Sequence, residues 1–463
     1  MQINRELFEK TPVPRALATL AIPSIISQLI TMVYNIADTI FIGMANDPSK
    51  TAAASLSFVL VFAMTCFGNL FGVGGGSLIS RLLGERKDQD AASVSSFSIW
   101  GSAACSLVYS LLTLAFMEPL MRLLGATDSS VGYAMDYALY VIVIGAVPAT
   151  VSMTMANLLR SEGRANYASF GLGMGGILNI ILDPLFMFVI LEPGNEVKGA
   201  AIATMLSNVV VLIFFLGVFL FLRGKTVLSM SFRRVIPERR YISSVFAVGF
   251  PSALSSFFAC VSNLIINNLA SSYSVLYGDV PVAAVGIAKK IDMLPMNVSI
   301  GLCQGMMPLV AYNYSSGNYK RMDGFSRAAR NTGIAFAGFC IILFEIFGGS
   351  IVRLFIGDAA TVDMGTSFLK ILCLSVPLLI INVQISFTFQ AMGMGKESLL
   401  LSSLRQGLVH IPLLFVMNAI FGLYGIVWTQ LVSDGLTCMI SLWLYVRSYR
   451  KLMSGDIPTV TDE

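Results

Sequence analysis

The sequence predicts an all-α integral membrane protein with twelve transmembrane helices in two pseudo-symmetric six-helix bundles. Three observations lead to this fold class: the composition, the recurrence of long apolar stretches, and an internal repeat at a nearly constant shift. Of the 463 residues, 56% are hydrophobic and 12% are charged, whereas a typical soluble domain has about 25% charged residues. We therefore expect the chain to be embedded in a lipid bilayer.

Apolar stretches recur along the whole chain, and each is long enough to cross a hydrocarbon layer of about 30 Å, which takes about twenty helical residues. The twelve predicted spans are residues 15–44, 52–80, 93–117, 131–159, 166–191, 198–222, 241–272, 282–311, 325–349, 366–392, 398–420 and 422–446. Because twelve is an even number, the two termini should lie on the same side of the membrane.

The basic residues gather on that side. Of the 30 Lys and Arg residues, 23 flank the spans on the side of the termini, and this group includes Lys396 and Arg405. Cytoplasmic loops are enriched in Lys and Arg. We therefore expect a multi-pass protein of the cytoplasmic membrane, with both termini and the loop 223–240 in the cytoplasm.

An internal repeat relates the two halves. Three prolines of the first half recur in the second at shifts of 228, 229 and 228 residues: Pro23 and Pro251, Pro148 and Pro377, and Pro184 and Pro412. Parallel repeats of this kind place a binding cavity between two lobes near the middle of the membrane. The predicted organisation is a cytoplasmic N-terminal segment (1–14), an N-lobe (15–222), an inter-lobe loop (223–240), a C-lobe (241–447) and a cytoplasmic tail (448–463).

Signatures of enzymes and cofactors are missing from the sequence. The Gly-rich stretch Gly72–Ser77 lacks the lysine of a phosphate-binding loop and is better explained by close helix packing. The seven cysteines are isolated in apolar stretches without metal-ligand spacing. For His410 we favour a packed or cavity-lining role over a proton relay. We expect no enzymatic activity, no cofactor, no permanent metal, no nucleic-acid partner and no cleaved signal peptide.

Two acids lie inside predicted spans. Asp183 stands in the middle of the span 166–191 and is followed by Pro184, which kinks a helix and frees a backbone carbonyl. Asp38 lies in the first span. A carboxylate near the bilayer centre costs at least about 3 kcal/mol, so it normally lines a cavity or binds a ligand. The alternative is an aspartic acid held protonated against a neighbouring helix.

Oxygen-bearing side chains accompany the two acids at helical spacing: Tyr34 and Asn35 before Asp38, Asn179 before Asp183, and Thr204 and Asn208 on the following span. Three helices of one lobe can thus converge on a proton or a small hard cation such as Na⁺. Burial favours the neutral carboxylic acid, so such a group can load and release a proton. The second half has Ile266 and Ile411 at the places of the two acids. We therefore expect the N-lobe to hold the coupling cation.

Charged residues of the second half are weaker candidates. Lys289, Lys290 and Asp292 can pair with one another, or Asp292 can face the central cavity and meet a cationic substrate. Asp434 occupies the repeat position of Asn208 and is a further candidate for the cavity. The 24 Met and 31 Phe residues would suit promiscuous binding of flat lipophilic cations.

These residues resemble the multidrug and toxic compound extrusion (MATE) transporters over essentially the whole chain. The matching motifs are AIPSIISQLITMVYNIADTIFIG, SRLLGERK, LLRSEG, ILNIILDPLF and GAAIAT in the first half, and GFPS, QGMMPLVAYNYSSGN and FQAMGMGK in the second. With one acid on the first span and another on the fifth, the chain looks most like the bacterial DinF-like and MepA-like branch.

The resemblance implies two rocking bundles that export organic cations in exchange for protons or sodium, a role in antibiotic resistance, and action as a monomer. It implies that the coupling cation binds at four positions: Asp38, Asn179, Asp183 and Thr204. It further implies a conformational hinge at Pro23, and a role for Asp292 with cationic substrates.

One departure from the family pattern concerns the second half. The acids that the NorM-like branch carries on its seventh and tenth helices are absent from residues 241–272 and 366–392, so a second-lobe cation site of that type is in doubt. A lipid-linked oligosaccharide flippase of the same superfamily is the alternative function. Such flippases need a large basic cavity, whereas the mid-membrane charges here are mostly acidic.

Overall fold

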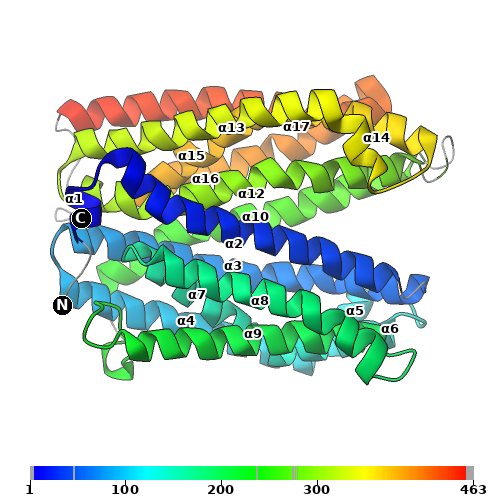
Figure 1. Cartoon of the computed structure of the whole chain (residues 1–463), viewed down its shortest axis with the longest axis horizontal. Helices are drawn as coiled ribbons and strands as arrows, with labels where there is room; N and C mark the ends of the chain where they lie inside the picture. Colours follow the sequence, from blue (N-terminus) through cyan, green and yellow to red (C-terminus); the bar gives the residue numbers. More distant parts are fainter. Residues whose placement is uncertain are drawn as a thin grey trace.

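The computed structural model describes residues 5–44, 47–235, 238–273, 276, 278 and 280–454. In this part of the chain all regular secondary structure is helical. The helices run side by side in two groups, one from each half of the chain (Figure 1). Residues 1–4 of the predicted N-terminal segment and residues 455–463 of the predicted tail lie outside the described residues.

The described part of the first half contains nine α-helices: α1 (Arg5–Glu9), α2 (Val13–Gly43), α3 (Pro48–Gly84), α4 (Asp88–Ala115), α5 (Met117–Leu123), α6 (Val131–Ala138), α7 (Ala146–Ser161), α8 (Ala165–Leu185) and α9 (Glu196–Phe221). Two π-helical segments continue α6 and α8, at Leu139–Ile144 and Phe186–Ile190.

The second half begins with a 3₁₀ turn at Phe232–Arg234 and then contains seven described α-helices: α10 (Arg239–Ser271), α12 (Val280–Ser315), α13 (Tyr319–Arg353), α14 (Ala359–Cys373), α15 (Val376–Met392), α16 (Gly395–Ser403) and α17 (His410–Ser454). A π-helical segment, Leu404–Leu408, joins α16 to α17.

The described helices are consistent with twelve membrane crossings. Among the described residues, nine helices are long and apolar enough to span a membrane, and two bent pairs raise the number to eleven. One of the nine, Gly395–Leu452, has 58 residues and would measure about 87 Å at 1.5 Å per residue. It turns back at Gly422, which has φ 59° and ψ −142°, so it supplies two crossings. The predicted fold class is confirmed.

The repeat is visible in the breaks of the helices. The fourth span bends by 47° between Ile144 and Ala146, and the tenth bends by 46° between Cys373 and Val376. The repeat pair Pro148 and Pro377 lies in the first turn after each break. Proline is tolerated there because the first N–H groups of a helix have no partner within the helix.

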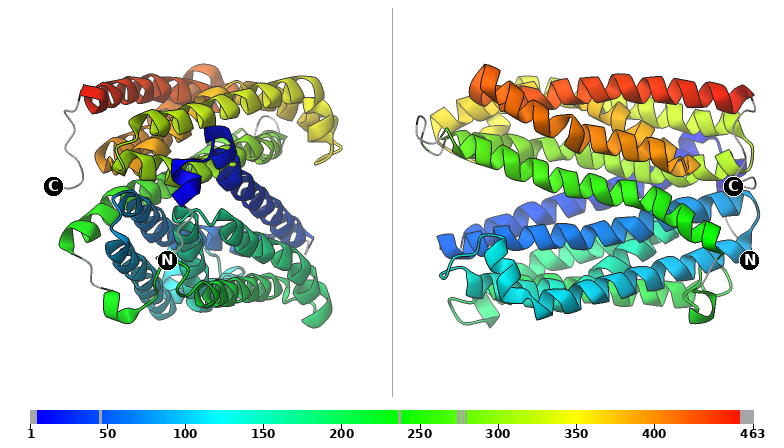
Figure 2. Two further views of the ribbon diagram at one scale, coloured as in Figure 1. Left: turned by 60° about the vertical axis from the view of Figure 1, so that its left-hand side comes forward. Right: turned by 180° about the vertical axis from the view of Figure 1, so that it is seen from behind.

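The two lobes meet near the end that carries the termini (Figure 2). A Cβ atom on Gly249 of α10 would overlap the carbonyl oxygen of Leu70 on α3, and one on Gly305 of α12 would lie 2.5 Å from the Cα of Ala21 on α2. Only glycine permits such close approach of two backbones. All four positions lie in the halves of their helices nearest the termini, so the lobes are packed together at that end.

Candidate functional site: a carboxylate-lined cavity in the N-lobe

A cavity of about 210 Å³ lies inside the N-lobe between α2, α3, α7, α8 and α9. Small residues of α8 let the neighbouring helices come close. A Cβ on Gly176 would lie 2.9 Å from Ile30 and 3.0 Å from the ring of Tyr34, both on α2. The GLGMGG segment of α8 therefore brings the polar face of α2 against the polar face of α8.

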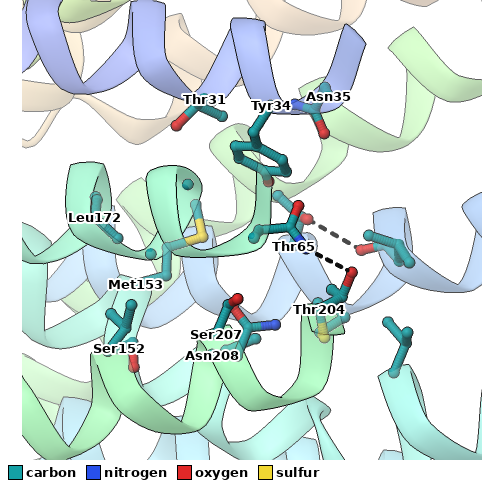
Figure 3. Close-up of a pocket in the computed structure, with 18 of the residues that line it drawn as sticks. Thr31, Tyr34, Asn35, Thr65, Ser152, Met153, Leu172, Thr204, Ser207 and Asn208 are labelled. Carbon is teal, nitrogen blue, oxygen red and sulfur yellow. Dashed lines mark hydrogen bonds between the residues drawn. The ribbon is translucent and has the colours of Figure 1, made fainter. Parts of the chain in front are cut away.

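The hydrogen bonds at the floor of the cavity centre on Asn179. Its amide donates to Oδ1 of Asp183, at 3.1 Å, and to the hydroxyl of Thr204 on α9, at 3.2 Å. Tyr34 and Asn35 line the cavity from α2, and Thr204 and Asn208 line it from α9 (Figure 3). Six of the seven N-lobe residues that the sequence singled out at helical spacing thus line the cavity, and the seventh, Asp183, is joined to them through its hydrogen bond from Asn179.

The two acids keep unused acceptor capacity. Asp183 has no exposed surface, and its second oxygen, Oδ2, has no hydrogen-bond partner among the described residues. The same holds for Oδ1 of Asp38. The carboxylates interact electrostatically with each other. Two acids of like charge, Asp183 buried and Asp38 half-buried, each with a buried oxygen that lacks a partner among the described residues, favour a bound proton or cation.

The donor set determines which ligand can bind. Carboxylate, amide and hydroxyl oxygens are hard ligands of the kind that small hard cations prefer. Within the described residues no group of three or more His, Cys, Asp or Glu side chains could hold a metal ion. The oxygen set and the two orphaned atoms fit an exchangeable H⁺ or Na⁺ better than a tightly held transition metal.

Sequence reasoning missed part of the lining. Tyr137 on α6 lines the cavity and lies within electrostatic range of Asp38 and Asp183. Thr65 of α3 and Ser152 of α7 also line it. Each of these residues offers only a single hydroxyl, and single hydroxyls are common in apolar helices, so nothing in the sequence singled them out.

The candidate residues of the second half lie elsewhere. Asp292 on α12 and Asp434 on α17 do not line this cavity. Asp434 accepts hydrogen bonds from Nε of Arg405, at 3.0 Å, and from the amide of Gln430, at 3.0 Å. Arg405, which we expected to flank the membrane in the cytoplasm, is instead the partner of this buried acid. Asp434 is therefore held in an ion pair within the C-lobe.

The remaining C-lobe charges surround this ion pair. Lys289 lies within electrostatic range of Asp292, Asp434 and Arg405. His410 is 5% exposed and lies within electrostatic range of Lys289 and Arg405. A packed histidine beside two cations is consistent with the packed role expected for it.

Pro23 and Pro184, the two prolines that we expect to act as conformational hinges, have different surroundings. Pro23 lies inside α2, which runs without a break from Val13 to Gly43. Pro184 lies near the end of α8 and is followed by the π-helical segment Phe186–Ile190. π-helical turns are common where a proline or a functional residue interrupts the regular hydrogen bonding of a helix. The backbone is thus irregular directly after Asp183.

Comparison with known proteins bears on this arrangement. The MatE family model matches residues 23–185 and 251–416, and the two matches begin at the repeat pair Pro23 and Pro251. The chain is 33% identical over 449 residues to "Multidrug export protein MepA" of Staphylococcus saprophyticus, covering 97% of both chains. The identity is also 33%, with the same coverage, to the protein of that description from Staphylococcus aureus strain MRSA252.

Solved structures give the same result at the level of the fold. A crystal structure of a MATE protein in complex with MaL6 is 25% identical and superposes with a TM-score of 0.90, covering 98% of this chain and 100% of that one. The matches cover both repeats and nearly the whole chain. The chain belongs to the MatE family, the multidrug and toxic compound extrusion transporters.

Proposed function

We propose that the protein is a multidrug efflux antiporter that exports lipophilic organic cations in exchange for protons or sodium. The observation that carries the proposal is the pair of carboxylates in one lobe, Asp38 and Asp183, each with a buried oxygen that has no hydrogen-bond partner in the described part of the chain. The similarity to proteins described as multidrug export proteins supports the drug-efflux part.

Coupling follows from the electrostatics of that pair. When both acids are ionised, their mutual repulsion and their missing hydrogen bonds disfavour the closely packed cavity. A proton or a sodium ion removes this penalty, and Asn179 and Thr204 complete its oxygen shell. The site binds the cation with different affinity in the two conformations of the N-lobe. Loading of the site therefore shifts the equilibrium toward the conformation that binds the cation more tightly.

Alternating access requires that the lobes separate at one end while they close at the other. The basic loops support a cytoplasmic location for the terminus-bearing end. Because the lobes are packed at that end, the conformation described here is closed toward the cytoplasm. Pro23 lies in this half of α2, where a missing backbone hydrogen bond lets the helix bend as the cavity changes its charge.

The substrate would contact both lobes. Tyr34, Asn35 and Asn208 offer aromatic and amide surfaces at the N-lobe cavity. Asp292 of the C-lobe has a buried oxygen, Oδ1, without a hydrogen-bond partner among the described residues, and it offers a counter-charge to an organic cation. We expect Asp292→Asn to weaken the transport of cations more than that of neutral substrates.

Transport by the purified protein in proteoliposomes tests the proposal. Efflux of a lipophilic dye cation is measured under a pH gradient and under a sodium gradient, applied separately. We expect one gradient to drive transport, and Asp183→Asn and Asp38→Asn to abolish it while both variants still fold. Asp363→Asn is the matched control, because Asp363 is an exposed acid of α14. Undiminished driven efflux by Asp183→Asn would remove the basis of the assignment.

A further inference from the structure

The first part of the inter-lobe loop, which follows α9, is hydrogen-bonded to the N-lobe. The hydroxyls of Ser95 and Ser96 on α4 donate to the carbonyl oxygen of Ser229, at 3.0 Å and 3.1 Å. The indole Nε1 of Trp100 donates to the carbonyl oxygen of Met230, at 3.0 Å. Earlier in the loop, the amide of Val227 donates to the buried carboxylate of Glu162, at 2.9 Å. The inter-lobe loop therefore follows the surface of α4 as far as Met230.

Directly after these contacts the chain presents an aromatic side chain outward. Phe232 begins the 3₁₀ turn and is 71% exposed. Its ring meets the ring of Trp100 edge-on, with centroids 5.4 Å apart, and Trp100 is itself 40% exposed. Trp and other aromatic residues gather at the level of lipid headgroups, where one end is apolar and the other is wet. This pair forms an apolar surface at the edge of the bundle.

Two arginines adjoin the aromatic pair. Arg233 and Arg234 are both exposed, and neither has a carboxylate partner in the described part of the chain. Other basic residues nearby are neutralised: Arg164 pairs with Glu162, at 3.3 Å, and Arg240 pairs with Glu238, at 2.7 Å. The segment 223–240 contains six basic residues and one acid. Two of these basic residues, Arg233 and Arg234, therefore place positive charge that is unpaired among the described residues directly beside Phe232.

We propose that Trp100, Phe232, Arg233 and Arg234 form a binding site for an anionic phospholipid in the leaflet at the terminus-bearing end. The guanidinium groups would hold the phosphate through paired N–H donors, as arginine does with phosphates in general. The acyl chain would lie against the two aromatic rings. The exposed aromatic surface favours a lipid over a soluble polyanion, because a soluble ligand would leave it in water.

The position of the site gives the lipid a structural role. The loop is fixed to α4 through Met230, and a few residues later it enters α10 at Arg239, which belongs to the other lobe. A headgroup bound at Arg233 and Arg234 therefore lies where the chain passes between the lobes. The proposal concerns lipid binding and does not depend on the identity of the coupling ion.

Fluorescence quenching by brominated lipids tests the site directly. The chain has three tryptophans, Trp100, Trp428 and Trp443, so the variant W428F/W443F leaves Trp100 as the reporter. It is reconstituted in vesicles that contain brominated phosphatidylglycerol or brominated phosphatidylcholine at equal mole fraction. We expect stronger quenching of Trp100 by the anionic lipid. R233Q/R234Q should reduce this preference, by about fivefold for each arginine removed.

The control is R447Q/R450Q, which removes two exposed arginines of α17 at the same end of the bundle. It makes the same change in charge and should leave the preference of Trp100 unchanged. Equal quenching by the two lipids in the parent, or equal losses in the two double variants, would overturn the proposal. So would binding of a soluble oligonucleotide at Arg233 and Arg234 without any lipid preference. The assay measures no transport, so its failure is distinct from a failure of the proposed function.

Discussion

The two lobes share a scaffold, but the buried acids Asp183 of the N-lobe and Asp434 of the C-lobe have different partners. In the N-lobe, Asp183 receives one hydrogen bond from Asn179, and its other oxygen has no partner among the described residues. In the C-lobe, Asp434 is bound on one oxygen by Arg405 and on the other by Gln430. A satisfied acid stabilises the structure, whereas an unsatisfied one is free to take up a cation. The contrast is consistent with a structural role for Asp434 and with the coupling role that we propose for Asp183.

The largest effect is expected from breaking the C-lobe ion pair. Asp434→Asn leaves the guanidinium of Arg405 buried without its counter-charge, and removal of one partner of such a pair destabilises by about 3–5 kcal/mol. We expect a marked loss of folded protein and a lower midpoint of thermal unfolding in detergent. Asp183→Asn removes a charge that has no counter-ion, so it should unfold at the same temperature as the parent or slightly higher. The assignment fails if Asp183→Asn is the less stable of the two.

Gly199 and Gly425 are 226 residues apart, the same offset that relates Asn208 to Asp434. Alanine at each position tests whether close packing is equally important in the two lobes. A Cβ on Gly425 would overlap the carbonyl oxygen of Met417, and one on Gly199 would lie 2.8 Å from the carbonyl oxygen of Phe186. Overpacking of this kind typically costs about 1–3 kcal/mol. We expect both alanine variants to lower the unfolding temperature, Gly425→Ala by more.

Gly217 on α9 supplies the control for the glycine series. A Cβ there meets nothing within 4 Å, and alanine is the better helix former. Gly217→Ala should therefore be neutral or slightly stabilising. A loss at Gly217 equal to that at Gly199 would mean that helix flexibility, and not close packing, explains the series.

The sequence predicted the scaffold well because membrane spans and a parallel repeat leave strong local patterns. The predicted span 166–191, for example, corresponds to α8 and its π-helical extension, Ala165–Ile190. The polar residues placed near Asp38 and Asp183 also lie together, because helical spacing fixes which side chains share a face. Contacts between distant spans could not be predicted in this way. Tyr137 at the cavity and Arg405 beside Asp434 both depend on tertiary packing.

The smallest effect is expected from one hydroxyl in each lobe. Thr204 accepts a hydrogen bond from the amide of Asn179, and Ser441 donates one to the side-chain oxygen of Asn382, at 3.0 Å, while the Asn382 amide donates to the carbonyl oxygen of Asp434. Thr204→Val and Ser441→Ala each remove one hydrogen bond, which contributes roughly 0.5–1.5 kcal/mol. Their effects on the unfolding temperature should be similar.

Their effects on transport should differ. Asn179 also binds Asp183, so loss of Thr204 frees its amide to reorient and weakens the oxygen shell of the coupling cation. Thr204→Val should need a higher concentration of the driving ion for half-maximal efflux, whereas Ser441→Ala should follow the parent. The measurement is the ion dependence of dye efflux in proteoliposomes. If both variants needed the same higher ion concentration for half-maximal efflux, the N-lobe cavity would not be the specific site of coupling.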